Sequence, residues 1–109
     1  MKTPISQSAA FVSELLLIRS DGSETLLTIR IGFPLKRGQG WVCPCEIDGL
    51  EPQYVDIHGE DSIQALCLAL KVVRSRLSSV INAGNTICLP KDRGHPLSVS
   101  LVRMLFGVD

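Results

Sequence analysis

The chain has 109 residues, of which 45% are hydrophobic and 5% aromatic, and it carries 11 basic and 11 acidic side chains. That length suits one domain and is too short for two, while the apolar fraction excludes general disorder. We therefore expect residues 1–109 to form a single α+β domain, with residues 1–10 as a flexible N-terminal segment. Beyond this class, the residues disclose no reaction and no ligand.

Neither a membrane span nor a secretion signal is visible. The most hydrophobic stretch, residues 63–70, is bounded by Asp61 and Lys71 and is shorter than the roughly 20 apolar residues that a membrane helix needs. The apolar run over residues 9–18 is interrupted by Glu14, and no small-residue cleavage pattern follows it. We expect a cytoplasmic protein whose cysteines stay reduced.

The balanced charge hides an uneven distribution along the chain. Residues 38–70 contain six acidic and no basic side chains, whereas residues 71–109 contain six basic and two acidic ones. Such a division can steer a charged partner toward one part of a surface. Nucleic acid is not expected as a partner, because no basic face with interleaved aromatic residues is evident.

Two strands joined by a tight turn are predicted near the N-terminus. A Leu-rich stretch over residues 11–19 precedes the pair Asp21-Gly22, which favours the positive φ angles of a hairpin turn. Residues 25–33 then alternate between apolar and polar side chains. This alternation is typical of a strand with one buried face.

Two further strands are predicted after a break that is rich in glycine. The third covers residues 41–48, and it should lie at a sheet edge or contain a bulge, because Pro44 cannot donate a ladder hydrogen bond. A turn over residues 49–52 leads to a fourth strand, in which Val55 and Ile57 face inward.

A long helix is predicted from Ile63 to Ile81. Asp61 is suited to be its N-cap, with Gln64 as the capping-box partner. One apolar stripe should cover the sheet, and it consists of Ile63, Leu66, Cys67, Leu70, Val73, Leu77 and Ile81. A second apolar flank consists of Ala65, Leu68, Ala69 and Val72. Because a sheet covers an arc of only about 100° or slightly more, this flank needs another cover, either the C-terminal segment or a second copy.

The C-terminal part should add one or two short elements. Gly84 is placed to end the long helix, residues 86–89 suit a short extended piece, and the apolar tail over residues 97–106 favours a short helix. The expected fold is therefore an antiparallel sheet of about four strands packed on one long helix, with a short C-terminal strand, a helix, or both.

Three side chains suggest acid–base or metal chemistry. If the apolar faces of the third and fourth strands match, Ile47 lies opposite Val55. In that register Glu46 faces Asp56, with His58 nearby. Two carboxylates and an imidazole can exchange protons or hold a divalent cation. The simpler interpretation is a solvated outer face with paired surface charges.

A different register would create a zinc site. A slip by one residue would bring Cys43 and Cys45 toward His58 and Asp56, and thiolates and imidazole are the ligands that zinc prefers. The Cys-Pro-Cys spacing is not that of a structural zinc site, and no second cysteine pair follows. We therefore expect both thiols on the core face, and no cofactor.

Two motifs resemble the core of a family of small uncharacterised bacterial proteins. The first is W-x-C-x-x-x-I-x-G-L, which begins at Trp41 and ends at Leu50, and the second is G-x-D-S-I-Q-A-L, from Gly59 to Leu66. The resemblance spans roughly residues 14–80. It implies a strand-rich N-terminal part that leads into one long helix, in a bacterial and cytoplasmic protein, and it carries no assigned activity.

Two functional hypotheses follow. The first is a non-enzymatic interaction module, which forms a homodimer or binds another protein through Ala65, Leu68, Ala69 and Val72. In one version the acidic residues 46–61 neutralise a basic toxin. The alternative is a small metal-dependent or acid–base enzyme that uses Glu46, Asp56 and His58. The sequence identifies no small-molecule ligand.

Overall fold

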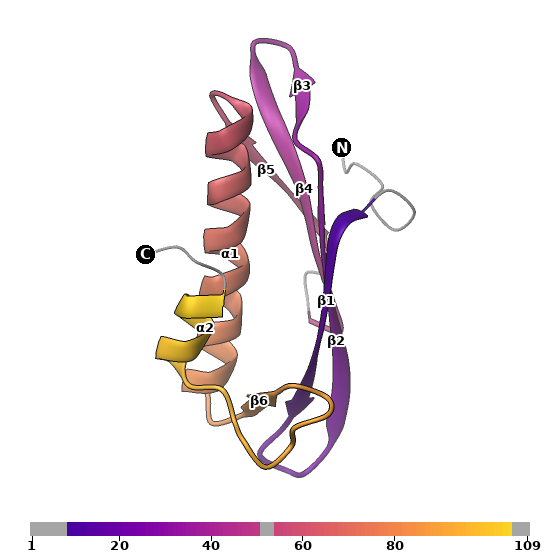
Figure 1. Ribbon diagram of the computed structural model, residues 1–109, viewed down its shortest axis with the longest axis vertical. Coiled ribbons are helices and arrows are strands. Elements are labelled where there is room, and N and C mark those ends of the chain that lie inside the picture. Colours follow the sequence, from indigo (N-terminus) through magenta and orange to yellow (C-terminus); the bar gives the residue numbers. More distant parts are fainter. Residues whose placement is uncertain (1–8, 51–53, 106–109) are drawn as a thin grey trace.

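The structure, a computed structural model, describes residues 9–50 and 54–105. Within those ranges, helix α1 lies along one face of an antiparallel sheet, and the short helix α2 lies beside α1 (Figure 1). The elements are β1 (Ala9–Ile18), β2 (Glu24–Gly32), β3 (Leu35–Arg37), β4 (Gly40–Asp48), β5 (Tyr54–Gly59), α1 (Ser62–Asn82), β6 (Thr86–Cys88) and α2 (Val99–Leu105). The predicted α+β class is confirmed, but the described sheet has six strands rather than about four.

The N-terminal hairpin forms as predicted. Asp21 accepts hydrogen bonds from the backbone N–H and the hydroxyl of Ser23, at 2.9 and 2.7 Å, and Gly22 has a φ of 89°. Of the segment 1–10 that we expect to be flexible, residues 1–8 lie outside the described residues, whereas Ala9 and Ala10 belong to β1.

Strand β4 lies inside the sheet rather than at its edge. β5 pairs with residues 41–46 of β4, while β2 pairs with residues 45–48 and β3 with residues 40–42. β2 and β3 therefore share one edge of β4, and β5 occupies the other. The break between β2 and β3 lies opposite Pro44, so a proline is tolerated there without an edge position.

The short strands β3 and β6 account for the difference in strand number. The Phe33-Pro34 pair interrupts the alternating pattern before β3 and hides it in the sequence. β6 is the short extended piece predicted near residue 86, and it pairs with residues 16–18 of β1. The tail also forms the expected short helix, α2.

Helix α1 begins and ends close to the predicted residues. The Asp61 carboxylate accepts a hydrogen bond from the backbone of Gln64 at 2.7 Å, and the Gln64 side chain accepts one from the Glu60 backbone at 2.6 Å. After the last turn, Gly84 has a φ of 97° and donates its N–H to Ile81 O at 3.0 Å. The caps were therefore predictable from local sequence.

The face that α1 turns to the sheet agrees only in part with the predicted stripe. Its fully buried residues are Ala65, Ala69, Val73 and Leu77. By contrast, Ile63 is 73% exposed and Cys67 is also exposed. Small side chains bring the helix close to the sheet, since a Cβ added to Gly59 would lie 2.5 Å from the Ala65 nitrogen. The prediction was right for Val73 and Leu77, which are buried, and for three further residues of the stripe that pack against the core, Leu66, Leu70 and Ile81. It was wrong for Ile63 and Cys67, in whose place the two alanines face the sheet.

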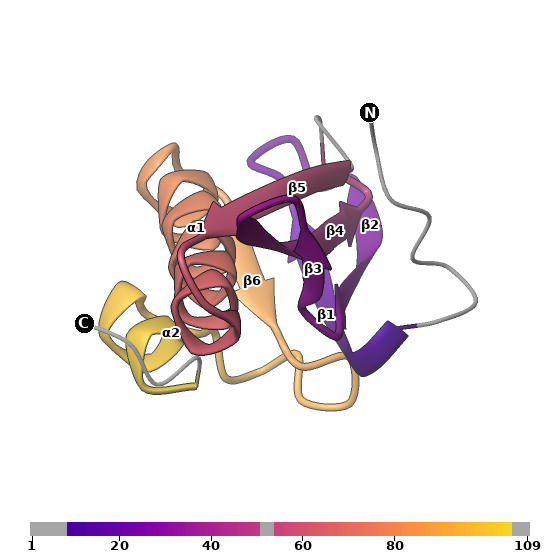
Figure 2. The ribbon, with the colours of Figure 1, turned by 90° about the horizontal axis from the view of Figure 1, so that it is seen from above.

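The core fills the space between α1 and the inner face of the sheet. The sheet contributes Leu15, Leu17, Leu27, Ile29, Ile31, Cys43, Cys45 and Ile47. Next to α1, Leu97 and Val102 are also buried, and Figure 2 shows α2 alongside the long helix. The C-terminal segment therefore packs against α1 and contributes to the core. In the described part of the chain, no helix is both long and apolar enough to span a bilayer.

Candidate functional site

The register of β4 and β5 does not place Glu46 opposite Asp56. Glu46 pairs with Tyr54, Asp56 with Pro44, and His58 with Val42, which is a shift of two residues from the predicted register. The shift keeps every side chain on its predicted face, because side chains alternate with a period of two. It separates the three candidate residues along the two strands.

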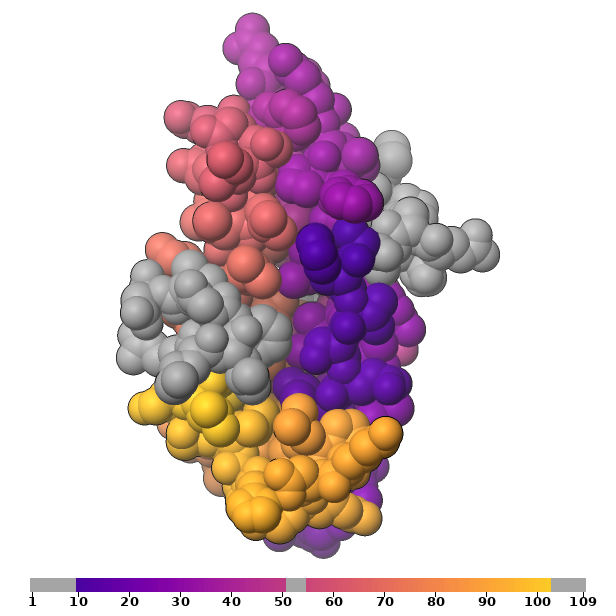
Figure 3. All heavy atoms as spheres, in the orientation of Figure 1, coloured from indigo at the N-terminus to yellow at the C-terminus, as the bar shows by residue number. Residues whose placement is uncertain are grey.

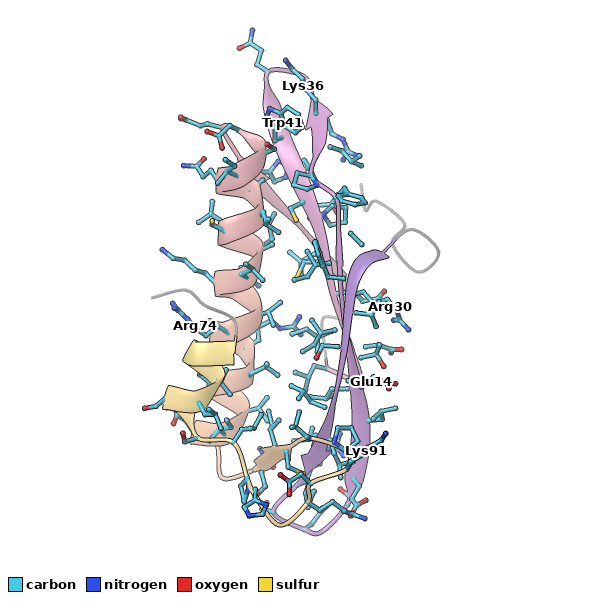
Figure 4. The ribbon with its side chains drawn as sticks, in the orientation of Figure 1. Glu14, Arg30, Lys36, Trp41, Arg74 and Lys91 are labelled. Atoms are coloured by element: carbon cyan, nitrogen blue, oxygen red, sulfur yellow. The ribbon has the colours of Figure 1, made fainter. Side chains whose placement is uncertain are left out.

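Each carboxylate of the predicted acid–base set contacts a different arginine. Glu46 lies 2.5 Å from an Arg30 guanidinium nitrogen, and Asp56 lies 3.5 Å from one of Arg37. Arg30 projects from the outer face of the sheet in Figure 4, and His58 is exposed. Arg30 and Glu46 are directly opposite each other on neighbouring strands, and such cross-strand ion pairs stabilise a sheet. Arg37 and Asp56 form a second ion pair, between β3 and β5.

The two cysteines of β4 lie on the core face, as expected. Cys43 pairs with Ile57 and Cys45 with Val55, and both thiols are buried. Burial raises the pKa of Cys43 to about 11 and that of Cys45 to about 12. His58 is in the alternate set of β5 side chains, so the zinc ligand set is not assembled. Within residues 9–50 and 54–105, no group of three metal-binding side chains occurs.

The predicted interaction flank is not a continuous outer surface. Ala65 and Ala69 are fully buried in the core, while Leu68 and Val72 are half-buried. The two alanines therefore belong to the packing between helix and sheet, and they must be removed from the predicted interface. An interaction role for Leu68 and Val72 stays a prediction.

A different surface is found at the outer edge of β1. β2 pairs along one edge of this strand, while on the other edge β6 pairs with residues 16–18. No described strand pairs with residues 9–15 on that side. In the hairpin turn, Arg19 N donates to Ser23 O at 2.8 Å, so the odd-numbered residues from Phe11 to Leu17 direct their backbone groups to β2. Because these directions alternate, Val12 and Glu14 direct theirs outward.

An apolar groove of about 290 Å³ lies beside this edge. Its lining residues are Phe11, Val12 and Ser13 from β1, Ile29 and Ile31 from β2, and Leu66 and Leu70 from α1. Figure 3 shows the indigo atoms of β1 and the salmon atoms of α1 on one face of the molecule. We call this groove, together with the outer edge of residues 9–15, the β1 surface.

Exposed apolar side chains gather at the β1 surface. Phe11 is 56% exposed, Val12 60% and Phe33 66%. The rings of Phe11 and Phe33 meet edge to face, with their centroids 6.3 Å apart. Contiguous exposed apolar groups of this kind mark places where proteins bind one another.

The loop that follows β6 closes the lower end of the β1 surface. Residues 89–91 lie beside Glu14 around a second, shallower hollow, and Figure 4 shows Lys91 near Glu14. An ion pair between Arg93 and Glu24 holds the loop to β2. A partner strand that runs along β1 must therefore end or turn away near residue 15.

Sequence reasoning missed the β1 surface. The Leu-rich stretch over residues 11–19 indicates a strand, but it does not show which strand ends up at an edge. The three-residue length of β6 decides that, since β6 covers only the last part of β1. The one local signal is the adjacent pair Phe11-Val12, which places two large apolar side chains on opposite faces of a strand.

Fold and surface together define a small α+β protein with an open-edged sheet and an apolar groove. The sequence model of a family described as a domain of unknown function (DUF6968) matches residues 13–97. The chain belongs to this family, which agrees with its resemblance to uncharacterised proteins and extends past residue 80. No curated protein and no solved structure matches the chain.

Proposed function

We propose that this protein is a non-enzymatic interaction module that binds an extended partner segment at the β1 surface. The observation that carries the proposal is the outer edge of residues 9–15, with which no strand of the described residues pairs, beside an apolar groove. A bacterial and cytoplasmic setting, expected from the motifs and the reduced thiols, is part of the same proposal.

Binding would use the backbone for affinity and the groove for selectivity. An added strand can hydrogen-bond to the outward groups of Val12 and Glu14, and alternate side chains of that strand can enter the groove. Proteins usually protect such edges with charges, prolines or bulges. β1 has a register shift between Ala9 and Phe11, but from Phe11 to Ile18 it contains no proline and only one charged residue.

The other two hypotheses receive less support. Glu46 and Asp56 contact Arg30 and Arg37, which reduces the negative charge that the acidic segment offers to a basic toxin. The same pairs occupy the carboxylates that an acid–base enzyme would need. The β1 surface, by contrast, consists of groups that a partner strand can complete.

Photo-crosslinking in the native host tests the proposal. A photoreactive phenylalanine analogue replaces Phe11 in one variant, and it replaces Leu26 in the control variant. Leu26 is 49% exposed, and it precedes the core residue Leu27, so it lies on the opposite face of the sheet. A third variant combines the analogue at Phe11 with Val12→Pro, which removes an outward N–H but no β1–β2 hydrogen bond.

We expect a defined protein adduct from position 11 that is absent from position 26 and that Val12→Pro abolishes. Adducts that form equally at both positions, or that persist with Val12→Pro, would contradict binding at the β1 surface. The absence of any adduct at position 11 would contradict it as well. Circular dichroism of each variant checks that the fold is retained.

A further inference from the structure

We propose that the partner at the β1 surface is a second copy of this chain, with the two β1 strands paired antiparallel about a two-fold axis at Val12. This inference rests on the proposed function and names its partner. In a two-fold interface each copy offers the same patch, so the β1 surface must be complementary to itself. Register, charge and groove size each test that requirement.

The register follows from the neighbouring strand β6. Leu16 already pairs with Cys88, so a second strand can pair with β1 only as far as Leu15. With Val12 opposite Val12, Phe11 of the second copy lies opposite Ser13, and the chain before it, where β1 shifts its register on β2, reaches the end of the available edge near Leu15. A shift of two residues toward β6 would place Ala10 of the second copy opposite Leu16, where Cys88 lies.

Charge favours the same register. Glu14 is the only charged residue between Ala9 and Ile18. A two-fold axis at Glu14 would set two carboxylates directly opposite each other, which destabilises a strand pair. With the axis at Val12, Glu14 lies opposite Ala10 of the second copy. The central pair then consists of two valines, which suit a strand pair.

The groove provides a site for an aromatic ring. In the Val12-centred register, Phe11 of the second copy lies opposite Ser13, on the face of β1 that looks toward α1. The groove measures about 290 Å³ and is lined mostly by apolar side chains, whereas a cavity of about 150 Å³ already holds benzene. The small side chain of Ser13 leaves the entrance open. Each copy would therefore fill the groove of the other with Phe11.

Disulfide trapping tests the partner and the register together. In a background with Cys67→Ser, which removes the exposed native thiol, Val12→Cys is compared with Glu14→Cys under mild oxidation. A hydrogen-bonded antiparallel pair has Cα atoms about 5.5 Å apart, within reach of a disulfide. The two Glu14 positions would be offset by four residues, or roughly 13 Å, which is beyond that reach.

We expect covalent dimers from Val12→Cys to form at least about tenfold faster than from Glu14→Cys. Light scattering should show a dimer of the unmodified chain, and Val12→Pro should raise the dissociation constant of that dimer by roughly tenfold or more. Leu26→Ser, on the outer face, should leave the dimer unchanged. Equal trapping at both positions, or a dimer that Val12→Pro does not change, overturns the inference.

The outcomes separate this inference from the proposed function. Suppose that the purified chain is monomeric, that the photoreactive analogue at position 11 crosslinks to a different protein, and that Val12→Pro abolishes this adduct. The partner is then not a second copy of this chain, and the proposed interaction module stands. If the chain is monomeric and position 11 captures nothing, both fail.

Discussion

Gly59 shows how a single residue sets the distance between two elements. It ends β5, and a Cβ at this position would meet Ala65 atoms at 2.5, 2.8 and 3.0 Å, of which two belong to the helix backbone. The motif from Gly59 to Leu66 therefore has a structural explanation: a glycine for close approach, Asp61 and Gln64 for the cap, and Ala65 for the core. Each of these roles is structural, and none of them involves catalysis or ligand binding.

Gly59→Ala should destabilise the protein by about 1–3 kcal/mol, because the added methyl group collides with backbone that cannot rotate away. Urea unfolding followed by circular dichroism gives the change in free energy of unfolding. Gly94→Ala is the matched control, since a Cβ there meets nothing within 4 Å. Equal effects of the two substitutions would show that β5 and α1 are not in close contact.

The buried thiols make the stability of the protein sensitive to alkaline pH. Burial raises the pKa of Cys43 to about 11 and of Cys45 to about 12, so the folded state keeps protons that the unfolded chain loses near pH 9. Above that pH the unfolded state binds fewer protons, and stability falls as pH rises. The free energy of unfolding should decrease between pH 9 and 11, by up to about 1.4 kcal/mol per pH unit for each thiol.

Urea titrations at a series of pH values measure this slope. Cys45→Ala should make it shallower above pH 9, whereas Cys67→Ser, at an exposed position, should leave it unchanged. A slope that is the same in all three proteins would mean that the β4 thiols are not buried.

At the scale of elements, the ends of α1 were predictable, whereas the residues that face the sheet were predicted only in part. Caps depend on a few adjacent residues, such as Asp61 and Gln64, and a sequence displays them directly. Rotation depends on which face fits the sheet. Ala65 and Ala69 decide it, because alanine allows close packing, and hydropathy alone does not distinguish them from the larger Ile63.

Leu77→Ala tests the packing of α1 against the sheet. Leu77 is fully buried, and its truncation should cost about 2–5 kcal/mol through lost apolar contact and the cavity that remains. The half-buried Leu68 is the matched control, and Leu68→Ala should cost clearly less. Thermal or urea unfolding of both variants provides the comparison, and a larger loss for Leu68→Ala would contradict the burial of Leu77 against the sheet.

The strands show a similar division between local and long-range information. The first hairpin was predictable because Asp21-Gly22 specifies a turn. The register of β4 with β5 was not, since a shift of the pairing by two residues keeps every apolar side chain on the same face of the sheet. That shift separated Glu46 from Asp56, so a candidate site inferred from register failed although the facing of each side chain was correct.

At the scale of the whole molecule, the length of one strand decides where a partner can bind. β6 has three residues and pairs with β1 only over residues 16–18, so the remainder of β1 keeps an unpaired edge among the described strands. The groove between β1 and α1 lies at the same place. Edge and groove together give the molecule one surface that is suited to strand addition.

Hydrogen exchange resolved by residue tests this account most directly. The amides of Val12 and Glu14 face the open edge, whereas the amide of Leu16 faces β6. We predict that Val12 and Glu14 become protected from exchange as protein concentration rises, while Leu16 is protected at every concentration. Exchange of Val12 and Glu14 at unprotected rates at the highest concentration, with Leu16 still protected, would contradict pairing of the two β1 strands.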